Sequence, residues 1–279
     1  MTRGALKRAP TRAQTMHPGH DMTTLHLSDP VRRTLGAALR PGGEFLTRRM
    51  LELAAPEPGG MALDAGCGTG ATLALLRKCG LLPLGLDLDA TLLGEARKTG
   101  VQAVRGDLAR LPLAPACMDL VICECAWNLT DKSRAMTEFA RVLRPGGRLL
   151  LSDIFARGAT DSSWPVRCCF AQAATLDDTR KRVEAAGFAV ESLEDHSPLL
   201  ARTAAEFVFR HGSLHAFWRA VTGDEKTAAE ACRAAQSSRP GLFLLVAVRK
   251  PEVPARPPAP SENENLKDPG LAANTRSFP

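Results

Sequence analysis

The chain has 279 residues, of which 44% are hydrophobic and 24% charged, and a formal net charge of +6 at pH 7. These values are typical of one globular domain with loose ends. No stretch approaches the roughly 20 apolar residues that a membrane-spanning helix needs, and the N-terminus lacks the apolar core of a signal peptide. We therefore expect a cytoplasmic protein without a membrane partner.

The excess positive charge is concentrated at the N-terminus. Arg3, Lys7, Arg8 and Arg12 precede the first acidic residue, Asp21. The remaining sequence is close to balanced and has no obvious basic groove, which argues against nucleic acid as a partner. We expect residues 1–21 to form a disordered or non-native leader, and residues 251–279, which are rich in Pro, Ala, Glu and Asn, to form a disordered tail.

Short apolar runs alternate with helical patterns in the intervening region, as a parallel sheet with crossover helices requires. We predict five buried strands in the first part of this region, at 61–64, 82–87, 101–105, 119–123 and 148–153. Helices are predicted between them, at 71–79, 90–99 and 133–143. An earlier helix should follow Pro41 and run to about Ala54.

The later part of the region predicts a helix at 175–186 and strands at 188–193 and 242–248. Residues 198–238 carry apolar side chains at helical spacing and are predicted to form a helical insertion. It either caps a pocket or covers a sheet edge. The fold is therefore predicted to be a Rossmann-like, doubly wound, mostly parallel seven-stranded sheet within residues 22–250, with a helical insertion before the last strand.

A glycine-rich loop, Gly66-Cys67-Gly68-Thr69-Gly70, follows the first predicted strand and opens a helix. Glycine permits a sharp turn and close approach of a nucleotide-type ligand to the backbone. This pattern alone fits either a dinucleotide or another adenosine-containing cofactor.

Acidic residues at successive strand ends distinguish these cofactors. Asp87 is placed to accept hydrogen bonds from a ribose diol. Asp64, immediately before the glycines, would repel a pyrophosphate but attract a cationic sulfonium or amino group. Asp107 is placed to accept a hydrogen bond from an adenine amino group. A nicotinamide-dependent oxidoreductase is therefore disfavoured.

From Leu63 to Phe155 the chain resembles the class I S-adenosylmethionine-dependent methyltransferases, particularly the small-molecule enzymes of the type 11/25 kind. The resemblance rests on the glycine loop, Gly85-Leu86-Asp87, Gly106-Asp107-Leu108 and Arg141-Val142-Leu143-Arg144-Pro145-Gly146-Gly147. It implies an enzyme that binds S-adenosyl-L-methionine. Its cofactor site should comprise Asp64, Gly66, Cys67, Gly68, Gly70, Asp87, Leu88, Asp107, Leu108 and Glu124.

The acceptor is expected to be a small molecule. The fourth strand lacks the Asp/Asn-Pro-Pro-aromatic motif of amide and adenine methyltransferases, and no Pro-Cys dipeptide of cytosine-carbon enzymes is present. Methyl transfer needs no obligatory base, because positioning and desolvation supply most of the rate. The weak catalytic candidates are Glu124, Asp153, His196 and Cys125.

Four cysteines support an alternative function. Cys123, Cys125, Cys168 and Cys169 could hold arsenite or another thiophilic acceptor. Against this, alternate residues on a strand share one face, so Cys123 and Cys125 could both be buried apolar residues, and tandem cysteines at a helix start are often structural. No resident metal is predicted. A non-catalytic cofactor-binding accessory protein is a further alternative, and Arg40 could pair with a ligand carboxylate or be a solvated surface residue.

Overall fold

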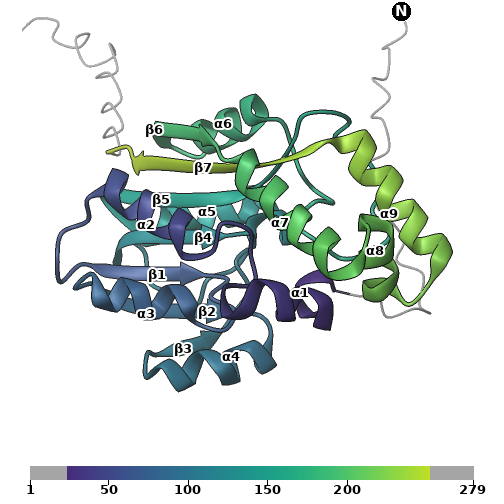
Figure 1. Ribbon diagram of the computed structural model, residues 1–279. Helices are drawn as coiled ribbons and strands as arrows, with labels where there is room; N and C mark the ends of the chain where they lie inside the picture. Colours follow the sequence, from purple (N-terminus) through teal and green to yellow (C-terminus); the bar gives the residue numbers. More distant parts are fainter. Residues whose placement is uncertain (1–23, 252–279) are drawn as a thin grey trace, which may run out of the picture.

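The computed structural model describes residues 24–251, which form a mixed sheet with helices on both faces (Figure 1). The predicted leader and, apart from Pro251, the predicted tail lie outside the described residues. The seven strands are β1 (Met61–Ala65), β2 (Leu82–Asp87), β3 (Ala103–Arg105), β4 (Met118–Glu124), β5 (Leu143–Ala156), β6 (Phe188–Asp195) and β7 (Pro240–Arg249).

The strand order is β3-β2-β1-β4-β5-β7-β6. β1 to β5 run parallel, whereas β7 pairs antiparallel with both β5 and β6. The predicted Rossmann-like fold is confirmed. Because β1 pairs with β2 on one side and β4 on the other, the chain reverses its direction of winding there, where open sheets bind ligands beyond the carboxyl ends of their strands.

Both faces of the sheet are covered, and the side chains of β4 show why. Val121 and Cys123 pack into one apolar cluster with Phe139 of α5 (Lys132–Val142), while Leu120 and Ile122 join the opposite cluster. This alternation is the period of two of a strand. Since both sets are buried, the strand sequence is continuously apolar, as in parallel sheets.

The predicted helices lie close to their predicted positions, whereas a short helix at Asp29–Leu35 was not predicted. Turn and cap residues set their limits, as where the Asp131 side chain accepts the Ser133 and Arg134 amides at the start of α5. The helices are α1 (Asp29–Leu35), α2 (Gly43–Ala54), α3 (Ala71–Lys78), α4 (Ala90–Ala96), α5 (Lys132–Val142), α6 (Leu176–Ala185), α7 (Ser197–His211), α8 (Leu214–Thr222) and α9 (Glu225–Ser238).

The insertion between β6 and β7 consists of α7, α8 and α9, which project beyond one end of the sheet beside α1 (Figure 1). They have their own apolar cluster, which includes Phe207, Phe217 and Trp218. Trp164, from the loop between β5 and α6, also belongs to it. The insertion is therefore packed around a second core rather than laid over the sheet edge alone.

Two expectations about the cysteines were wrong. Cys125 lies just beyond β4 with a φ of 54°, so the strand alternation ends before it and its side chain leaves the face that Cys123 occupies. Cys168 and Cys169 lie in the loop before α6, not at a helix start.

β5 begins at Leu143, five residues before the predicted start, because Leu143 pairs with Met118 ahead of the Pro-Gly-Gly segment.

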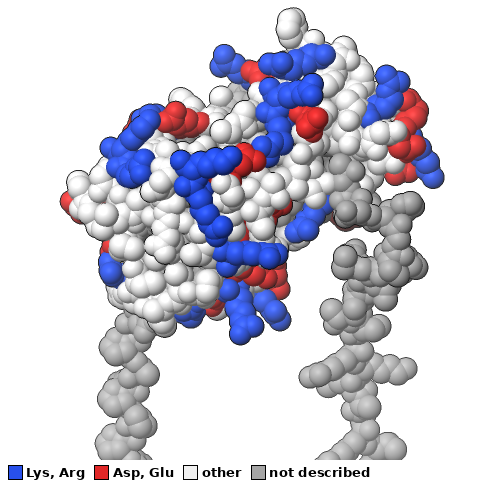
Figure 2. Space-filling view, turned by 90° about the horizontal axis from the view of Figure 1, so that it is seen from below, with Lys and Arg blue, Asp and Glu red and all other residues white. Residues whose placement is uncertain are grey.

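Among residues 24–251, no helix is both long and apolar enough to cross a membrane. On the face in Figure 2, lysine and arginine side chains form separate groups, most with acidic side chains beside them. Among the described residues, ion pairs join Arg32 to Glu95 and Arg49 to Glu194.

Candidate cofactor and acceptor site

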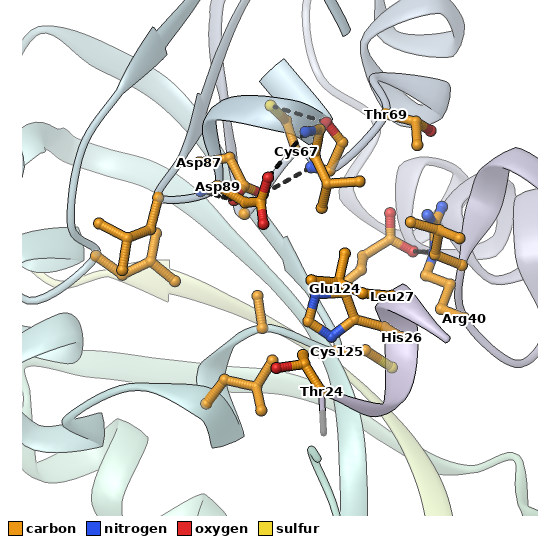
Figure 3. A pocket seen from close by; sticks show the side chains of 18 of the residues that line it. Thr24, His26, Leu27, Arg40, Cys67, Thr69, Asp87, Asp89, Glu124 and Cys125 are labelled. Carbon is orange, nitrogen blue, oxygen red and sulfur yellow. Dashed lines mark hydrogen bonds and ion pairs between the residues drawn. The ribbon is translucent and has the colours of Figure 1, made fainter. Parts of the chain in front are cut away.

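A cleft of about 550 Å³ lies at the carboxyl ends of β1, β2 and β4. The glycine loop, the ends of these strands and the N-terminal segment around η1 (Leu25–Leu27) form its walls (Figure 3). Of the predicted cofactor residues, eight line it: Gly66, Cys67, Gly68, Asp87, Leu88, Asp107, Leu108 and Glu124. Asp64 and Gly70 do not line this cleft.

The glycine loop is fixed by its own backbone and by Asp87. Gly66 has a φ of 86°, and a Cβ there would lie 2.4 Å from the Cβ of Ala126, so only glycine fits. The Gly68 amide donates to Asp87 Oδ2 at 2.8 Å, and the Asp89 amide donates to Asp87 Oδ1 at 2.9 Å. Asp87 therefore joins the loop to the end of β2, while each carboxylate oxygen keeps a second lone pair for a ligand.

The remaining cleft residues combine polar and apolar groups. Asp107 is exposed and accepts the Ala109 amide at 2.9 Å through Oδ1. Leu88 is 52% exposed although it is a large aliphatic residue, and Leu108 on the same cleft is buried. An exposed leucine between Asp87 and Asp89 offers apolar contact to a flat ring.

Glu124 at the end of β4 is the centre of a buried polar network. Arg40 donates through Nε to Glu124 Oε2 at 2.8 Å, and the hydroxyls of Thr47 and Thr72 donate to the same carboxylate. Arg40 is only 9% exposed, so a solvated surface position is wrong for it. With three donors on its carboxylate, Glu124 serves better as a fixed negative charge than as a proton acceptor.

Asp64 lies within electrostatic reach of Glu124, Arg40 and Asp87, but its own carboxylate is poorly satisfied. It is 2% exposed, and Oδ2 has no hydrogen-bond partner among the described residues. Burial, reinforced by the negative charge of Glu124, raises the pKa of Asp64 to about 8. A cationic group brought to this end of β1 would stabilise the carboxylate.

The other catalytic candidates fall in different places. Cys125 lines the cleft beside Glu124. Asp153 is fully buried behind it and accepts the amides of Asn128 and Ile154 at 2.9 and 2.8 Å. His196 lies elsewhere: it contacts Glu194 at 2.9 Å and the edge of the Phe45 ring, and it lines neither this cleft nor the pocket beneath α7 and α8.

His26 is a cleft residue that the sequence did not single out. It lies on η1, about 40 residues before the glycine loop, and its imidazole points into the cleft (Figure 3). No hydrogen bond or ion pair joins it to the rest of residues 24–251. Burial lowers the pKa of His26, while Asp87 and Asp89 act in the opposite direction. No local motif marks such a residue, because only the fold brings it to the glycine loop.

A second pocket, of about 160 Å³, adjoins the cleft beneath α7 and α8. Four residues line both spaces: His26, Leu39, Cys125 and Leu129. At this shared wall, Cys125 lies close to Cys169 and Asp153, and the three residues bring one potential ligand atom each to within 4.8 Å of one another. Cys123 and Cys168 are instead buried in two different apolar clusters.

Comparison with known proteins identifies the family to which a chain with this site belongs. A methyltransferase-domain family model matches residues 63–151. A demethylmenaquinone methyltransferase of Mycobacterium marinum is 32% identical over 180 residues, covering 61% of this chain and 68% of that protein. This chain belongs to the class I S-adenosylmethionine-dependent methyltransferases.

Other similarities agree with this methyltransferase assignment. A malonyl-[acyl-carrier protein] O-methyltransferase of Herminiimonas arsenicoxydans is 37% identical over 108 residues, which are 38% of this chain and 42% of that protein. The phosphoethanolamine N-methyltransferase 2 of Haemonchus contortus shares the fold, with a TM-score of 0.65 at 19% identity over 80% of this chain and 56% of that chain. The chain spans about half the length of the first curated relatives it matches.

The cofactor of this methyltransferase family is S-adenosylmethionine, and the cleft fits it chemically. The fixed charge of Glu124, which lines the cleft, suits a ligand that carries a sulfonium and an ammonium group; the buried carboxyl of Asp64, which does not line the cleft, lies within electrostatic reach of Glu124. Asp87 and the exposed Leu88 suit a nucleoside. A dinucleotide would instead bring its pyrophosphate toward two buried carboxyl groups.

Proposed function

We propose that this chain transfers the methyl group of S-adenosylmethionine to a small molecule. The observation that carries the proposal is the wall that the two spaces share. An acidic cleft suited to the cofactor and an apolar pocket meet at His26, Leu39, Cys125 and Leu129. We infer that the two spaces join between these residues, so a cofactor in one and an acceptor in the other would bring their reacting atoms together there.

The bound cofactor would supply an electrophilic methyl group on a positively charged sulfur. Asp64 and Glu124 would hold the charged end of the cofactor, Asp87 its ribose, and Asp107 with Leu108 its adenine. The apolar side chains of the second pocket would orient the acceptor and exclude water. Orientation and desolvation are sufficient to supply most of the rate for such a displacement.

Calorimetry tests the cofactor half of this proposal. S-adenosylmethionine and S-adenosylhomocysteine should bind, and NAD should not. Asp87→Ala should weaken binding by about 1.5–3 kcal/mol, because charged hydrogen bonds to the ribose and to the glycine loop are lost. Asp177→Ala, at an exposed ion pair on α6, is the matched control. Tight NAD binding without sulfonium binding would refute the proposal.

Transfer of a labelled methyl group to a pool of small metabolites tests the catalytic half. Labelled product that appears only in the presence of the intact protein supports an enzyme. Cofactor binding without transfer to any acceptor would favour the alternative of a non-catalytic accessory protein.

A second candidate function is methylation of a thiophilic metalloid such as arsenite. The proximity of Cys125, Cys169 and Asp153 favours it, since thiolates bind soft ions. The hydrogen bond with Cys125 and, after it, burial raise the pKa of Cys169, so ion binding would have to displace thiol protons. Methylated arsenic in assays with arsenite, lost in Cys125→Ala and Cys169→Ala but retained in the exposed Cys79→Ala, would establish this function.

We also propose that the protein works in the reducing cytosol. All eight cysteines are free, including the close pair Cys125 and Cys169, and free thiols persist in such a compartment. Thiol titration of protein prepared without reductant should recover eight free groups under denaturing conditions. Recovery of six would indicate a disulfide and an oxidising location.

A further inference from the structure

The side chains that line the pocket beneath α7 and α8 indicate which chemical class of methyl acceptor fits there. This inference rests on the proposed function. Most of its lining side chains come from η1, α1, α7 and α8 and from the loop between β5 and α6. They line a space that shares His26, Leu39, Cys125 and Leu129 with the cofactor cleft. An acceptor seated there would reach the cofactor cleft past the shared residues, which include His26 and Cys125.

Apart from the His26 imidazole on the shared wall, the pocket has no group that could neutralise a charged acceptor. Among its described lining residues there is no Asp, Glu, Lys or Arg. The Thr203 hydroxyl already donates to the Leu199 carbonyl at 3.1 Å, and burial raises the pKa of the Cys168 thiol to about 12. Moving an ammonium, carboxylate or phosphate into such surroundings is costly unless a partner charge is present.

Aromatic side chains shape the pocket. Trp164 stacks on Phe170 with ring centroids 5.0 Å apart, and Phe207 stacks on Phe217 at 4.0 Å. Trp218 is tilted against both Trp164 and Phe217. The volume of about 160 Å³ compares with an apolar cavity of about 150 Å³ that binds benzene. These surfaces fit a flat, uncharged ring.

His26 is the group on the shared wall best suited to receive a proton. Its imidazole is unpartnered among residues 24–251 and reaches both spaces. The charges around it come from four elements: Asp87 at the end of β2, Asp89 before α4, Arg32 on α1 and Arg167 on the loop after β5. Burial nevertheless keeps the imidazole neutral at pH 7 by lowering its pKa, which leaves one ring nitrogen as an acceptor.

We infer that the acceptor is an uncharged, ring-containing hydroxyl compound, such as a phenol or enol, which seats its ring in the apolar pocket and gives its proton to His26. The O–H bond breaks and its proton passes to the imidazole nitrogen. The oxygen lone pair forms the new O–CH₃ bond, and the electrons of the C–S bond remain on sulfur. The products are a methyl ether, S-adenosylhomocysteine and an imidazolium that then releases its proton to solvent.

Acceptor chemistry is tested with labelled cofactor and four probes: phenol, 2-naphthol, phosphoethanolamine and glycine. Phenol or 2-naphthol should be methylated at least ten times faster than the two charged probes at equal concentration. Faster methylation of a charged probe would overturn the inference while leaving the proposed methyl transfer intact. Failure of the protein to bind S-adenosylmethionine in calorimetry would overturn both.

Two variants on one helix test the location of the acceptor. Ala204 of α7 lines the pocket, whereas its neighbour Ala205 is exposed and does not line it. Ala204→Leu should raise the KM for the ring probe tenfold or more without changing cofactor affinity, because the added side chain fills the pocket. Ala205→Leu should match the parent protein. Equal KM values for the two variants would place the acceptor elsewhere.

The role of His26 is tested by His26→Gln and by the pH profile. His26→Gln should lower kcat for the ring probe about a hundredfold, with the affinity for cofactor retained and activity partly restored by added imidazole. The acid limb of kcat/KM in the parent should inflect below 6.5, because the pKa is lowered from that value, and should vanish in the variant. A variant with unchanged kcat and the same acid limb would exclude His26 as the proton acceptor.

Discussion

Asp64 and Glu124 are neighbouring buried carboxyl groups with different surroundings. Glu124 receives Arg40 and two threonine hydroxyls, whereas Asp64 has an oxygen without a partner in the described part of the chain. The single arginine cannot satisfy both groups. The site therefore contains one negative charge that the protein has compensated and one carboxyl group that favours its protonated form until a cation arrives.

Cofactor binding is consequently expected to release a proton from Asp64. With a pKa of about 8 in the free protein, Asp64 is mostly protonated at pH 7, and a bound cation favours the carboxylate. Calorimetry at pH 7 in buffers of different ionisation enthalpy should reveal release of up to about one proton. Affinity should rise as the pH increases toward 8. Asp64→Asn should abolish the release, and a parent protein that releases none would contradict the argument.

The predictability of individual site residues depended on whether a local pattern marked them. The glycine loop, Asp87 and Asp107 follow buried strands, so their positions at one sheet edge could be inferred from the sequence. His26 and Thr47 could not, because each reaches the site through tertiary packing from a segment with no motif of its own. The positive φ of Cys125 likewise has no signature in a non-glycine residue.

The segment from Leu39 to α2 stabilises the site through Arg40. Arg40 spans from this segment to Glu124 on β4 and Thr72 on α3. Removing its charge would leave a buried carboxylate beside Asp64 without its counter-charge. Breaking one partner of a buried ion pair costs more than losing an exposed one, because the remaining charge stays desolvated.

Arg40→Met is therefore expected to lower the free energy of unfolding by about 3–5 kcal/mol. Arg48→Met is the matched control on the adjacent helix. Its ion pair with Glu44 is exposed, so a loss of about 0.2–1 kcal/mol is expected. Denaturant unfolding measures both. Adding Glu124→Gln to Arg40→Met should recover part of the loss, and equal effects of the two single variants would show that the buried network is not stabilising.

At the level of elements, apolar periodicity was sufficient to predict all seven strands and the helical nature of the insertion. Buried parallel strands are short continuous apolar runs, and their neighbouring helices carry a different period. The early start of β5 was missed because Arg144, Pro145 and the two glycines read as a turn. They form an irregular segment of the strand between Leu143, which pairs with Met118, and Arg148, which pairs with Leu120. The arrangement of α7 to α9 around Trp164 depends on contacts across about 50 residues, which periodicity does not encode.

Across the whole molecule, segments distant in sequence enclose the same ligands. Residues of η1, the segment around Leu39, the glycine loop and the ends of β2 and β4 all line the cofactor cleft. The N-terminal segment is therefore part of the binding site as well as part of the packing. Its backbone should be ordered further when ligands bind.

Hydrogen exchange with and without S-adenosylhomocysteine should show this coupling. Peptides from residues 24–42, 66–70 and 87–89 should exchange more slowly in the complex, because local opening must break contacts with the ligand. Peptides from α6 and β6, which are remote from the cleft, serve as the internal reference. Protection confined to 66–89 would show that the N-terminal segment does not close on the ligand.

The antiparallel pairing of β6 with β7 has a consequence for protein engineering. Asp195 pairs with Phe243, so the insertion leaves and re-enters the sheet at adjacent points, like a hairpin with a very large loop. The acceptor-facing helices can thus be exchanged as a cassette between Asp195 and Pro240 while the strands that carry the cofactor cleft stay continuous. Chimeric enzymes with new acceptor ranges are most simply built at these two junctions.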